Sequence, residues 1–278
     1  MQVAEDFLRR SRIADLGRYY VTAFVREVAA NLPAGSKILD AGAGECAYKP
    51  LFAHCRYHSV DLAVGDEHWN YGHLDFVAHL DALPMDDATY DAVLCTQVLE
   101  HVPNPQECLR EMARVLKAGG KLFLTVPMAQ SEHQAPYDFF RYTSFGLKHL
   151  CDQAGFGDLV IRPLGGGMFT RWAYELPRAM AIFPGTGMRL GRLSWKGLLL
   201  APLRLVALCI VRFTQLLLLV LEYFDHAKDD PFGWQLTARK IVTIQHVVKS
   251  RHPRVGLSGI QGEKLDSGQN HAGMTVQE

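Results

Sequence analysis

The feature that most constrains the fold of this chain is a short apolar run that leads into a glycine-containing turn. The letters KILD at residues 37–40 are typical of a buried strand, and AGAG follows at residues 41–44. Because glycine has no side chain, a turn of small residues after a strand lets a ligand approach the backbone closely. A strand that passes through such a turn into a helical segment predicts the first unit of a parallel α/β sheet.

The rest of the chain continues this alternation. Helical spacing of apolar residues and apolar runs between turn signals define the expected elements. Helices are expected at residues 4–31, through 51–52, and at 105–116 and 143–155, and further strands at 57–60, 75–80, 90–95, 121–126, 159–162 and 235–247. We therefore expect an α/β fold: a Rossmann-like, doubly wound, mostly parallel seven-stranded sheet, with a helical, apolar C-terminal insertion before the last strand.

These expectations divide the chain into five parts. Residues 1–35 form an N-terminal helical segment, and 36–165 form the Rossmann-like core. Residues 166–230 form a basic, apolar helical cap or membrane-associated insertion, and 231–249 form the closing strand. Residues 250–278 are rich in Gly, Ser, Gln and Asn, which predicts a flexible tail.

Composition excludes some classes of partner and site. Lys+Arg and Asp+Glu number 29 each, so the net charge gives no sign of a polyanionic partner, and we expect no nucleic-acid partner. The six cysteines form no CxxC pair, which predicts reduced, buried thiols in a cytoplasmic protein. His54 and His58 are four residues apart, but a strand is expected to begin between them. We therefore predict no metal site.

A carboxylate after the second strand completes a candidate cofactor site. Asp61 ends that strand about 20 residues after the turn, where a carboxylate can accept hydrogen bonds from ribose hydroxyls. A dinucleotide site needs a third glycine, which is missing here, and Glu45 would lie near its pyrophosphate. S-adenosylmethionine has no phosphate and carries a sulfonium and an ammonium group. An acidic turn with Asp40 and Glu45 suits that ligand better.

Further motifs follow this turn in a characteristic order. They are DAGAG at 40–44, DALPM at 81–85, QVLEHV at 97–102 and RVLKAGGKL at 114–122. With them, residues 36–165 resemble the UbiE-like (methyltransferase type 11) group of class I S-adenosylmethionine-dependent methyltransferases. Cys46 stands where that group usually has a third glycine.

The resemblance implies S-adenosylmethionine as the cofactor and a set of residues that bind it. By analogy, Asp61 would bind the ribose and Asp81 would face the exocyclic amine of the adenine. The full set of expected cofactor-binding residues is Asp40, Gly42, Gly44, Asp61, Asp81, Ala82, Leu83 and Gln97.

Methyl transfer depends mainly on alignment of the reacting atoms, so a strong catalytic motif is not required. Ligands of open α/β sheets bind beyond the carboxyl ends of the strands. The catalytic candidates there are His101 after the fourth strand, and His133 and Tyr142 after the fifth. Each has a structural alternative: His101 orders the turn before Pro103, and the segment 133–143 is either a lid or a local arrangement. In the second case Asp138 and Arg141 form an ion pair, and Thr143 or Ser144 caps the next helix.

The region after the core is basic and apolar. Residues 162–221 hold eight Lys and Arg residues against the single acid Glu175, a net charge of +7. This combination favours an anionic membrane surface, with residues 190–225 as the contact. Residues 198–224 are long enough to span a bilayer, but their polar residues fall on one side of a helix: Arg204, Arg212, Gln215 and Glu222. The stripe suits a helix lying on a membrane or facing the protein; a true span and a core or dimer helix are the alternatives.

Taken together, these features predict methyl transfer to a lipophilic small molecule, such as a quinone precursor, an isoprenoid or a lipid-linked sugar. The protein would be cytoplasmic, peripheral or monotopic at the inner face of a membrane. Two other functions fit parts of the sequence: a non-catalytic, membrane-associated protein that binds the cofactor, and an NAD-dependent oxidoreductase. The methylated atom and the oligomeric state do not follow from the sequence.

Overall fold

A computed structural model describes residues 16–65, 69–177 and 201–241 of the chain. Within these residues the strands form one seven-stranded sheet in the order β3-β2-β1-β4-β5-β7-β6. The strands are β1 (Lys37–Ala41), β2 (Arg56–Asp61), β3 (Phe76–Val77), β4 (Tyr90–Thr96), β5 (Leu116–Pro127), β6 (Phe156–Pro163) and β7 (Gly233–Lys240). Strands β1 to β5 pair in parallel, and β7 pairs antiparallel with both β5 and β6. The mostly parallel seven-stranded sheet is therefore confirmed.

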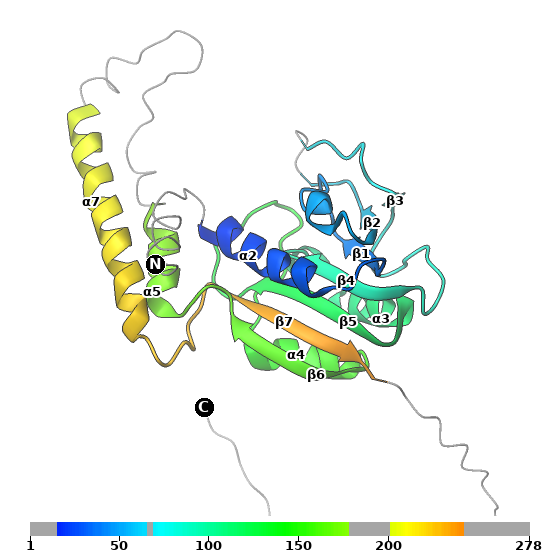
Figure 1. Ribbon diagram of the computed structural model, residues 1–278. Helices are drawn as coiled ribbons and strands as arrows, with labels where there is room; N and C mark the ends of the chain where they lie inside the picture. The colour runs from blue at the N-terminus through cyan, green and yellow to red at the C-terminus, as the bar shows by residue number, and fades with distance from the viewer. Residues whose placement is uncertain (1–15, 66–68, 178–200, 242–278) are drawn as a thin grey trace, which may run out of the picture. The chain divides into compact units, whose positions relative to one another are not determined.

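Helices cover both faces of this sheet (Figure 1). Neighbouring strand residues point to opposite faces, so Ile38 and Leu39 enter different cores. On one face α2 (Leu16–Asn31) packs over Ile38, Leu94 and Phe123. On the other, α3 (Pro105–Val115) and α4 (Ser144–Gln153) pack over a larger core that holds Leu39. Burial on both faces explains why the central parallel strands β1 and β4 are mostly apolar.

The segment after the first turn differs from the expectation of a helix there. It contains only the short 3₁₀ helix η1 (Lys49–Phe52), which begins beside Pro50. Fourteen residues separate β1 from β2, and the turn itself uses several of them, including Cys46 with a φ of +57°. A full α-helix does not fit in the remainder, so Phe52 alone anchors this crossover in the core beside α2.

Two helices lie between β6 and β7 in the chain: α5 (Met168–Glu175) and α7 (Ala201–Leu221), with the 3₁₀ helix η4 (Glu222–Phe224) directly after α7. Helices α5 and α7 pack against each other (Figure 1). Of the four polar residues expected on one side of this segment, Gln215 and Glu222 face α5, whereas Arg212 is exposed. Gln215 is buried and its Nε2 donates to the Ala173 carbonyl at 2.9 Å, and the Glu222 carboxylate accepts from the backbone N–H groups of Gly167 and Thr170 at 2.8 and 2.9 Å.

The other sides of α7 are apolar and exposed. Phe213 is 70% exposed and Ile210 60%, and Leu203, Leu205 and Val206 are also exposed. By length and composition the segment Pro202–Phe224, with a mean hydropathy of 2.1, could cross a membrane. The six cysteines are free thiols, as expected. Four of them are buried, namely Cys46, Cys95, Cys108 and Cys151, and Cys55 is partly buried. Cys209 on α7 is exposed, so the expectation that all six are buried is wrong for it. The expected tail at 250–278 lies outside the described residues.

Candidate functional site

A cavity of about 930 Å³ opens where the strand ends of the parallel half of the sheet meet the covering loops. This volume is near the upper end of the ~300–1,000 Å³ that small-molecule sites usually occupy. Its lining comes from the turn after β1, the loops after β2, β4 and β5, and parts of α2 and α5. Ligand sites of open α/β sheets lie at this edge, and the cavity is large enough for two ligands.

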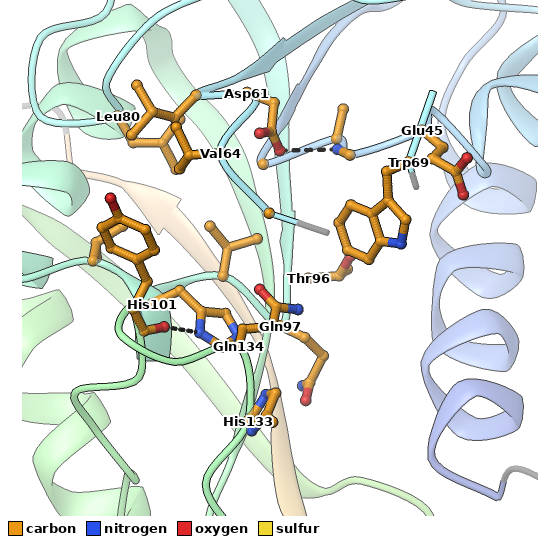
Figure 2. Close-up of a pocket in the computed structure, with 18 of the residues that line it drawn as sticks. Glu45, Asp61, Val64, Trp69, Leu80, Thr96, Gln97, His101, His133 and Gln134 are labelled. Atoms are coloured by element: carbon orange, nitrogen blue, oxygen red, sulfur yellow. Dashed lines mark hydrogen bonds between the residues drawn. The ribbon is translucent and has the colours of Figure 1, made fainter. Parts of the chain in front are cut away.

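The turn after β1 and the end of β2 are joined by the Asp61 carboxylate. Gly44 N donates to Asp61 Oδ2 at 2.9 Å (Figure 2). Ala63 N donates to Oδ1 at 2.8 Å. Each carboxylate oxygen can accept a second hydrogen bond. Gly42, Gly44 and Asp61 all line the cavity, as the sequence predicted. Asp61 is thus held rigidly with acceptor capacity left for a ligand that carries two hydroxyls.

Gly42 is required for a different reason from the one expected. Its φ is +85°, and a Cβ added to it would lie 2.3 Å from Val98 Cγ2. The space beside this glycine is therefore filled by the protein's own side chain rather than by a ligand. At Gly44 the nearest side chain is Trp69, with a ring carbon 3.3 Å from an added Cβ. Trp69 lies beside the turn in Figure 2.

Asp40 and Glu45 act within the protein, and the expectation for them needs correction. Asp40 is 1% exposed, does not line the cavity, and accepts a hydrogen bond of 2.5 Å from the Tyr57 hydroxyl. Burial raises the pKa of Asp40 to about 7. Glu45 does line the cavity, but its Oε1 accepts from Asn70 N at 3.0 Å. It thereby holds the segment that carries Trp69.

The next loop contributes Asp81 to the cavity, together with His79 and Leu80. Ala82 and Leu83 are not among the lining residues. Leu83 is buried, and its backbone N–H and carbonyl bind the Glu111 carboxylate and the Arg114 guanidinium, both at 2.9 Å. Side chains of α3 therefore fix this loop from behind, and Asp81 is its carboxylate at the cavity.

The chain turns sharply after β4 and brings Thr96 and Gln97 to the cavity. Gln97 has a φ of +55°, in the left-handed region that is unfavourable for a side chain other than glycine. Its backbone N–H donates to the Thr125 carbonyl at 2.9 Å and its Nε2 to Thr125 Oγ1 at 3.2 Å. These two bonds to β5 hold Gln97 in the position that the sequence predicted for it.

Of the three catalytic candidates, the structure brings together two. His101 and His133 both line the cavity, and their rings are 4.8 Å apart between centroids in an edge-to-face arrangement. Tyr142 is buried away from the cavity, and its hydroxyl donates to the Leu99 carbonyl at 2.7 Å. Burial also raises the pKa of Tyr142 well above its usual range. Tyr142 therefore supports the loop instead of contacting a substrate.

The surroundings of the two histidines are charged and ordered. Arg141 binds Asp138 through two hydrogen bonds of 2.7 and 2.9 Å, and Asp138 Oδ2 also accepts from His133 N at 2.8 Å. This ion pair holds the pKa of Asp138 well below its usual range. Thr143 is the cap of α4, since its side chain accepts from Gly146 N. The expected ion pair of Asp138 with Arg141 and the expected cap at Thr143 are thus both confirmed.

A buried carboxylate lies beside His101. Glu100 is 0% exposed, and burial raises its pKa to about 8. Burial likewise lowers the pKa of His101. The distance between His101 Nε2 and Glu100 Oε1 is 3.8 Å. Figure 2 shows both histidines at the lower end of the cavity, away from Asp61.

Several residues that line the cavity come from elements far apart in the chain, and no sequence pattern marks them. Trp69 comes from the loop after β2, Arg18 and Val21 from α2, and Tyr174 from α5. The Tyr174 ring stacks on Phe232 with centroids 5.1 Å apart, and both line the cavity. An aromatic residue in the last turn of a helix such as α5, or in an irregular loop, has no local signal, because its role depends on how distant elements pack.

The charges on the lining fit a cationic ligand with a diol. Among the described residues, three carboxylates line the cavity, those of Glu45, Asp61 and Asp81, against the single guanidinium of Arg18. A ligand with a sulfonium, an ammonium and two ribose hydroxyls is matched by this lining better than a pyrophosphate is. Figure 2 shows Glu45 and Asp61 at the upper end of the cavity, and the aromatic pair Tyr174 and Phe232 adds an apolar surface to its lining.

Comparison with known proteins agrees with this reading. A family profile described as a methyltransferase domain matches residues 39–124. The demethylmenaquinone methyltransferase of Staphylococcus haemolyticus is 30% identical over 179 residues, which cover 48% of this chain and 74% of that enzyme.

Two further similarities are more limited. The ubiquinone biosynthesis O-methyltransferase of Xanthomonas axonopodis pv. citri is 33% identical over 112 residues, 34% of this chain and 44% of that enzyme. The chain therefore matches less than half the length of this relative. A SAM-dependent methyltransferase structure from Archaeoglobus fulgidus is 17% identical, with a TM-score of 0.49, and the match covers 84% of this chain and 99% of that one.

Proposed function

Because this chain belongs to the class I S-adenosylmethionine-dependent methyltransferases, we propose that it transfers a methyl group to a lipophilic small molecule at a membrane surface. The observation that carries the proposal is a cavity whose lining includes both the acidic turn after β1 and the aromatic pair Tyr174 and Phe232. The family assignment also replaces the NAD-dependent alternative.

The acidic part of the cavity fits the cofactor. S-adenosylmethionine, when bound, supplies an electrophilic methyl group on a sulfonium. Asp61 would accept hydrogen bonds from the ribose hydroxyls, since both of its oxygens keep acceptor capacity. Asp81 and Leu80 would flank the adenine, and the backbone of the turn at Gly42 and Gly44 would lie along the ligand. Thr96 and Gln97 are fixed next to this part by β5.

The aromatic part of the cavity fits an apolar acceptor. Tyr174 and Phe232 present a stacked apolar surface, and Val21 adds to it from α2. The two relatives named above are a demethylmenaquinone methyltransferase and an enzyme of ubiquinone biosynthesis, and both names concern quinones. A quinone precursor or another isoprenoid-linked ring is therefore the acceptor class that we propose. His101 and His133 are the polar side chains that would lie beside its reacting end.

Helix α7 supports delivery of such an acceptor from a membrane. Twenty-one residues of α-helix measure about 30 Å. Gln215 and Glu222 bond to α5, and most of the exposed surface of α7 is apolar, which is the pattern of a helix that lies in a bilayer interface. Tyr174 lines the cavity directly before the end of α5, the helix on which α7 packs. The α5–α7 pair would thus dock on the membrane and leave the cavity near its surface.

Calorimetric titration with S-adenosylmethionine, S-adenosylhomocysteine and NAD tests the cofactor assignment. We expect micromolar binding of the first two and none of NAD. Binding should be lost in Asp61→Ala and kept in Asp158→Ala, which removes an exposed carboxylate on β6. A folded protein that binds neither sulfonium compound nor its product would refute the assignment.

Turnover then separates an enzyme from a protein that only binds the cofactor. Incubation with S-adenosylmethionine carrying a labelled methyl group and a bacterial lipid extract should transfer label to the organic phase. Asp61→Ala should abolish this transfer, and Asp158→Ala should not. Tight cofactor binding with no labelled lipid in any extract would favour the non-catalytic alternative.

A further inference from the structure

Three side chains with metal-binding atoms gather at one end of the cavity. Glu100 and His101 come from the 3₁₀ helix η2 (Leu99–His101), and His133 comes from the loop after β5. Their potential ligand atoms all lie within 4.8 Å of one another. Sequence spacing does not predict this cluster, because 32 residues separate its two histidines and Glu100 is adjacent to one of them.

The hydrogen bonds of both histidines leave Nε2 as the available atom. His101 Nδ1 is 2.5 Å from the Tyr137 carbonyl oxygen, and His133 Nδ1 is 3.1 Å from the Ser131 carbonyl oxygen. A carbonyl oxygen only accepts, so the neutral His101 ring carries its hydrogen on Nδ1. Nδ1 of His133 also lies 3.5 Å from Arg141 Nη2, which only donates, but its contacts with the acceptors Ser131 O and Asp138 Oδ2 favour the hydrogen on Nδ1 there too. The lone pair is then on Nε2. Metal-bound histidines are commonly oriented in this way, with the second nitrogen donating to a carbonyl or carboxylate.

Glu100 lacks the partners that a buried carboxylate needs. Its side chain is 0% exposed, and neither oxygen has a hydrogen-bond partner within the described part of the chain. Arg141 is close enough to influence it but is engaged by both oxygens of Asp138. An ionised carboxylate in such a place is very unfavourable without a counter-charge. A bound cation next to it would remove this cost.

We infer that Glu100, His101 and His133 bind one divalent transition-metal ion at the edge of the cavity. Two imidazole nitrogens and one carboxylate oxygen are a ligand set that Zn²⁺ takes readily in sites with an open position. His101 and His133 line the cavity, so an open position would face it and could receive an oxygen atom of the acceptor. The site goes beyond the proposed methyl transfer, since it needs neither the cofactor nor the acceptor to bind the ion.

Zinc titration of the full-length protein, stripped of metal with a chelator, tests this inference. The informative variants are Glu100→Gln and His133→Gln, and the matched control is His149→Gln, which changes an exposed histidine on α4. Glu100→Gln keeps the shape of the side chain and introduces no charge, so the fold should be retained, which circular dichroism checks. His133→Gln provides an independent variant, because His133 is at the edge of the cavity.

The wild type and His149→Gln should bind one more equivalent of Zn²⁺ than Glu100→Gln and His133→Gln, or bind it at least 100-fold more tightly. Co²⁺ in place of Zn²⁺ should give visible absorption bands in the first pair that are missing in the second. Equal zinc stoichiometry and affinity in all four proteins would overturn the inference. The titration with S-adenosylmethionine is separate, so failure of the metal site and failure of the proposed function remain distinguishable.

Discussion

Among individual residues, Asp40 shows most directly how the fold alters the chemistry of a side chain. Its carboxyl group is buried and accepts a hydrogen bond from Tyr57, and its pKa is raised to about 7. In the unfolded chain the same group has a pKa near 3.8. The folded state therefore binds this proton more tightly, and folding becomes less favourable as the pH rises from about 4 to 7.

Asp40→Asn should remove this penalty. Between pH 5.5 and pH 8, the free energy of unfolding of the variant should rise relative to the wild type by about 2 kcal/mol, because one pKa unit corresponds to ~1.4 kcal/mol. Urea unfolding of both proteins at the two pH values measures the difference. Parallel pH dependence in the two proteins would show that Asp40 ionises as readily in the folded state as in the unfolded chain.

Gly42 gives a second prediction for a single position. Gly42→Ala combines an unfavourable φ of +85° with a clash against Val98, so it should lower the free energy of unfolding by roughly 2–4 kcal/mol. Val98→Ala in the same chain should recover the part due to the clash and leave the part due to φ. Thermal unfolding of both single variants and the double variant gives the coupling. Additive effects would mean that Val98 does not occupy this space.

Site residues could be predicted from the sequence only where a local motif marks them. Gly42, Gly44, Asp61, Asp81 and Gln97 each follow a strand in a recognisable pattern, and all five line the cavity. Asp40 belongs to the same motif but points into the protein, which the letters alone do not distinguish. Trp69 and Tyr174 have no such pattern. Tyr142 belongs to an aromatic segment that is typical of a lid, but its side chain is buried and bonds to the Leu99 carbonyl.

At the scale of elements, helix α7 has a large exposed apolar surface, while the buried Gln215 on its other side bonds to α5. Ile210 and Phe213 are one helical turn apart and are 60% and 70% exposed. Such a surface on a soluble domain usually marks an interaction site. A bilayer interface would bury both side chains, and each fully buried side chain of this size contributes roughly 1.5–3 kcal/mol.

Ile210→Ser combined with Phe213→Ser should weaken binding to vesicles that contain anionic lipid by at least tenfold. Because both side chains are exposed, the thermal midpoint should change little. Phe145→Ser is the matched control, since Phe145 is 85% exposed but lies on α4. Flotation of the three proteins with vesicles measures the effect. Unchanged flotation of the double variant would remove α7 from the membrane contact.

More of the fold than of the site could be predicted from the sequence, because strands and helices each have a periodic or continuous pattern of apolar residues. Strands β1, β4 and β5 and helix α3 have continuous apolar runs or helical spacing, and each was expected within a few residues. A helix was expected in the crossover after β1, but only the short η1 forms, because the connection between β1 and β2 is short and contains Pro50. The pairing of β7 with both β5 and β6 is a long-range property that no local pattern contains.

At the scale of the whole molecule, the cavity is lined by residues from Gly17 to Phe232, so a ligand there touches segments from most of the described chain. A ligand that binds only the folded state stabilises it by an amount set by its concentration. At 100 times the dissociation constant this is about 2.7 kcal/mol.

S-adenosylmethionine at that concentration should therefore raise the free energy of unfolding by about 2.7 kcal/mol. It should also slow amide hydrogen exchange in the turn after β1 and in the loop that carries Trp69. Urea unfolding and exchange followed by mass spectrometry give the two readouts. Asp61→Ala at the same ligand concentration is the control and should show neither effect. Equal stabilisation by NAD would contradict the cofactor assignment.

The pairing of β6 with β7 has a consequence for how such a protein can diversify. Pro163 and Trp234 are direct partners in this antiparallel pair, and the whole α5–α7 excursion departs from and returns to that one point. The sheet keeps its strand order whatever segment joins these two residues. Exchange of this single stretch would also replace Tyr174 and Phe232 in the lining of the cavity, so the excursion is the part of the chain through which the second ligand can change while Asp61 and the turn after β1 stay the same.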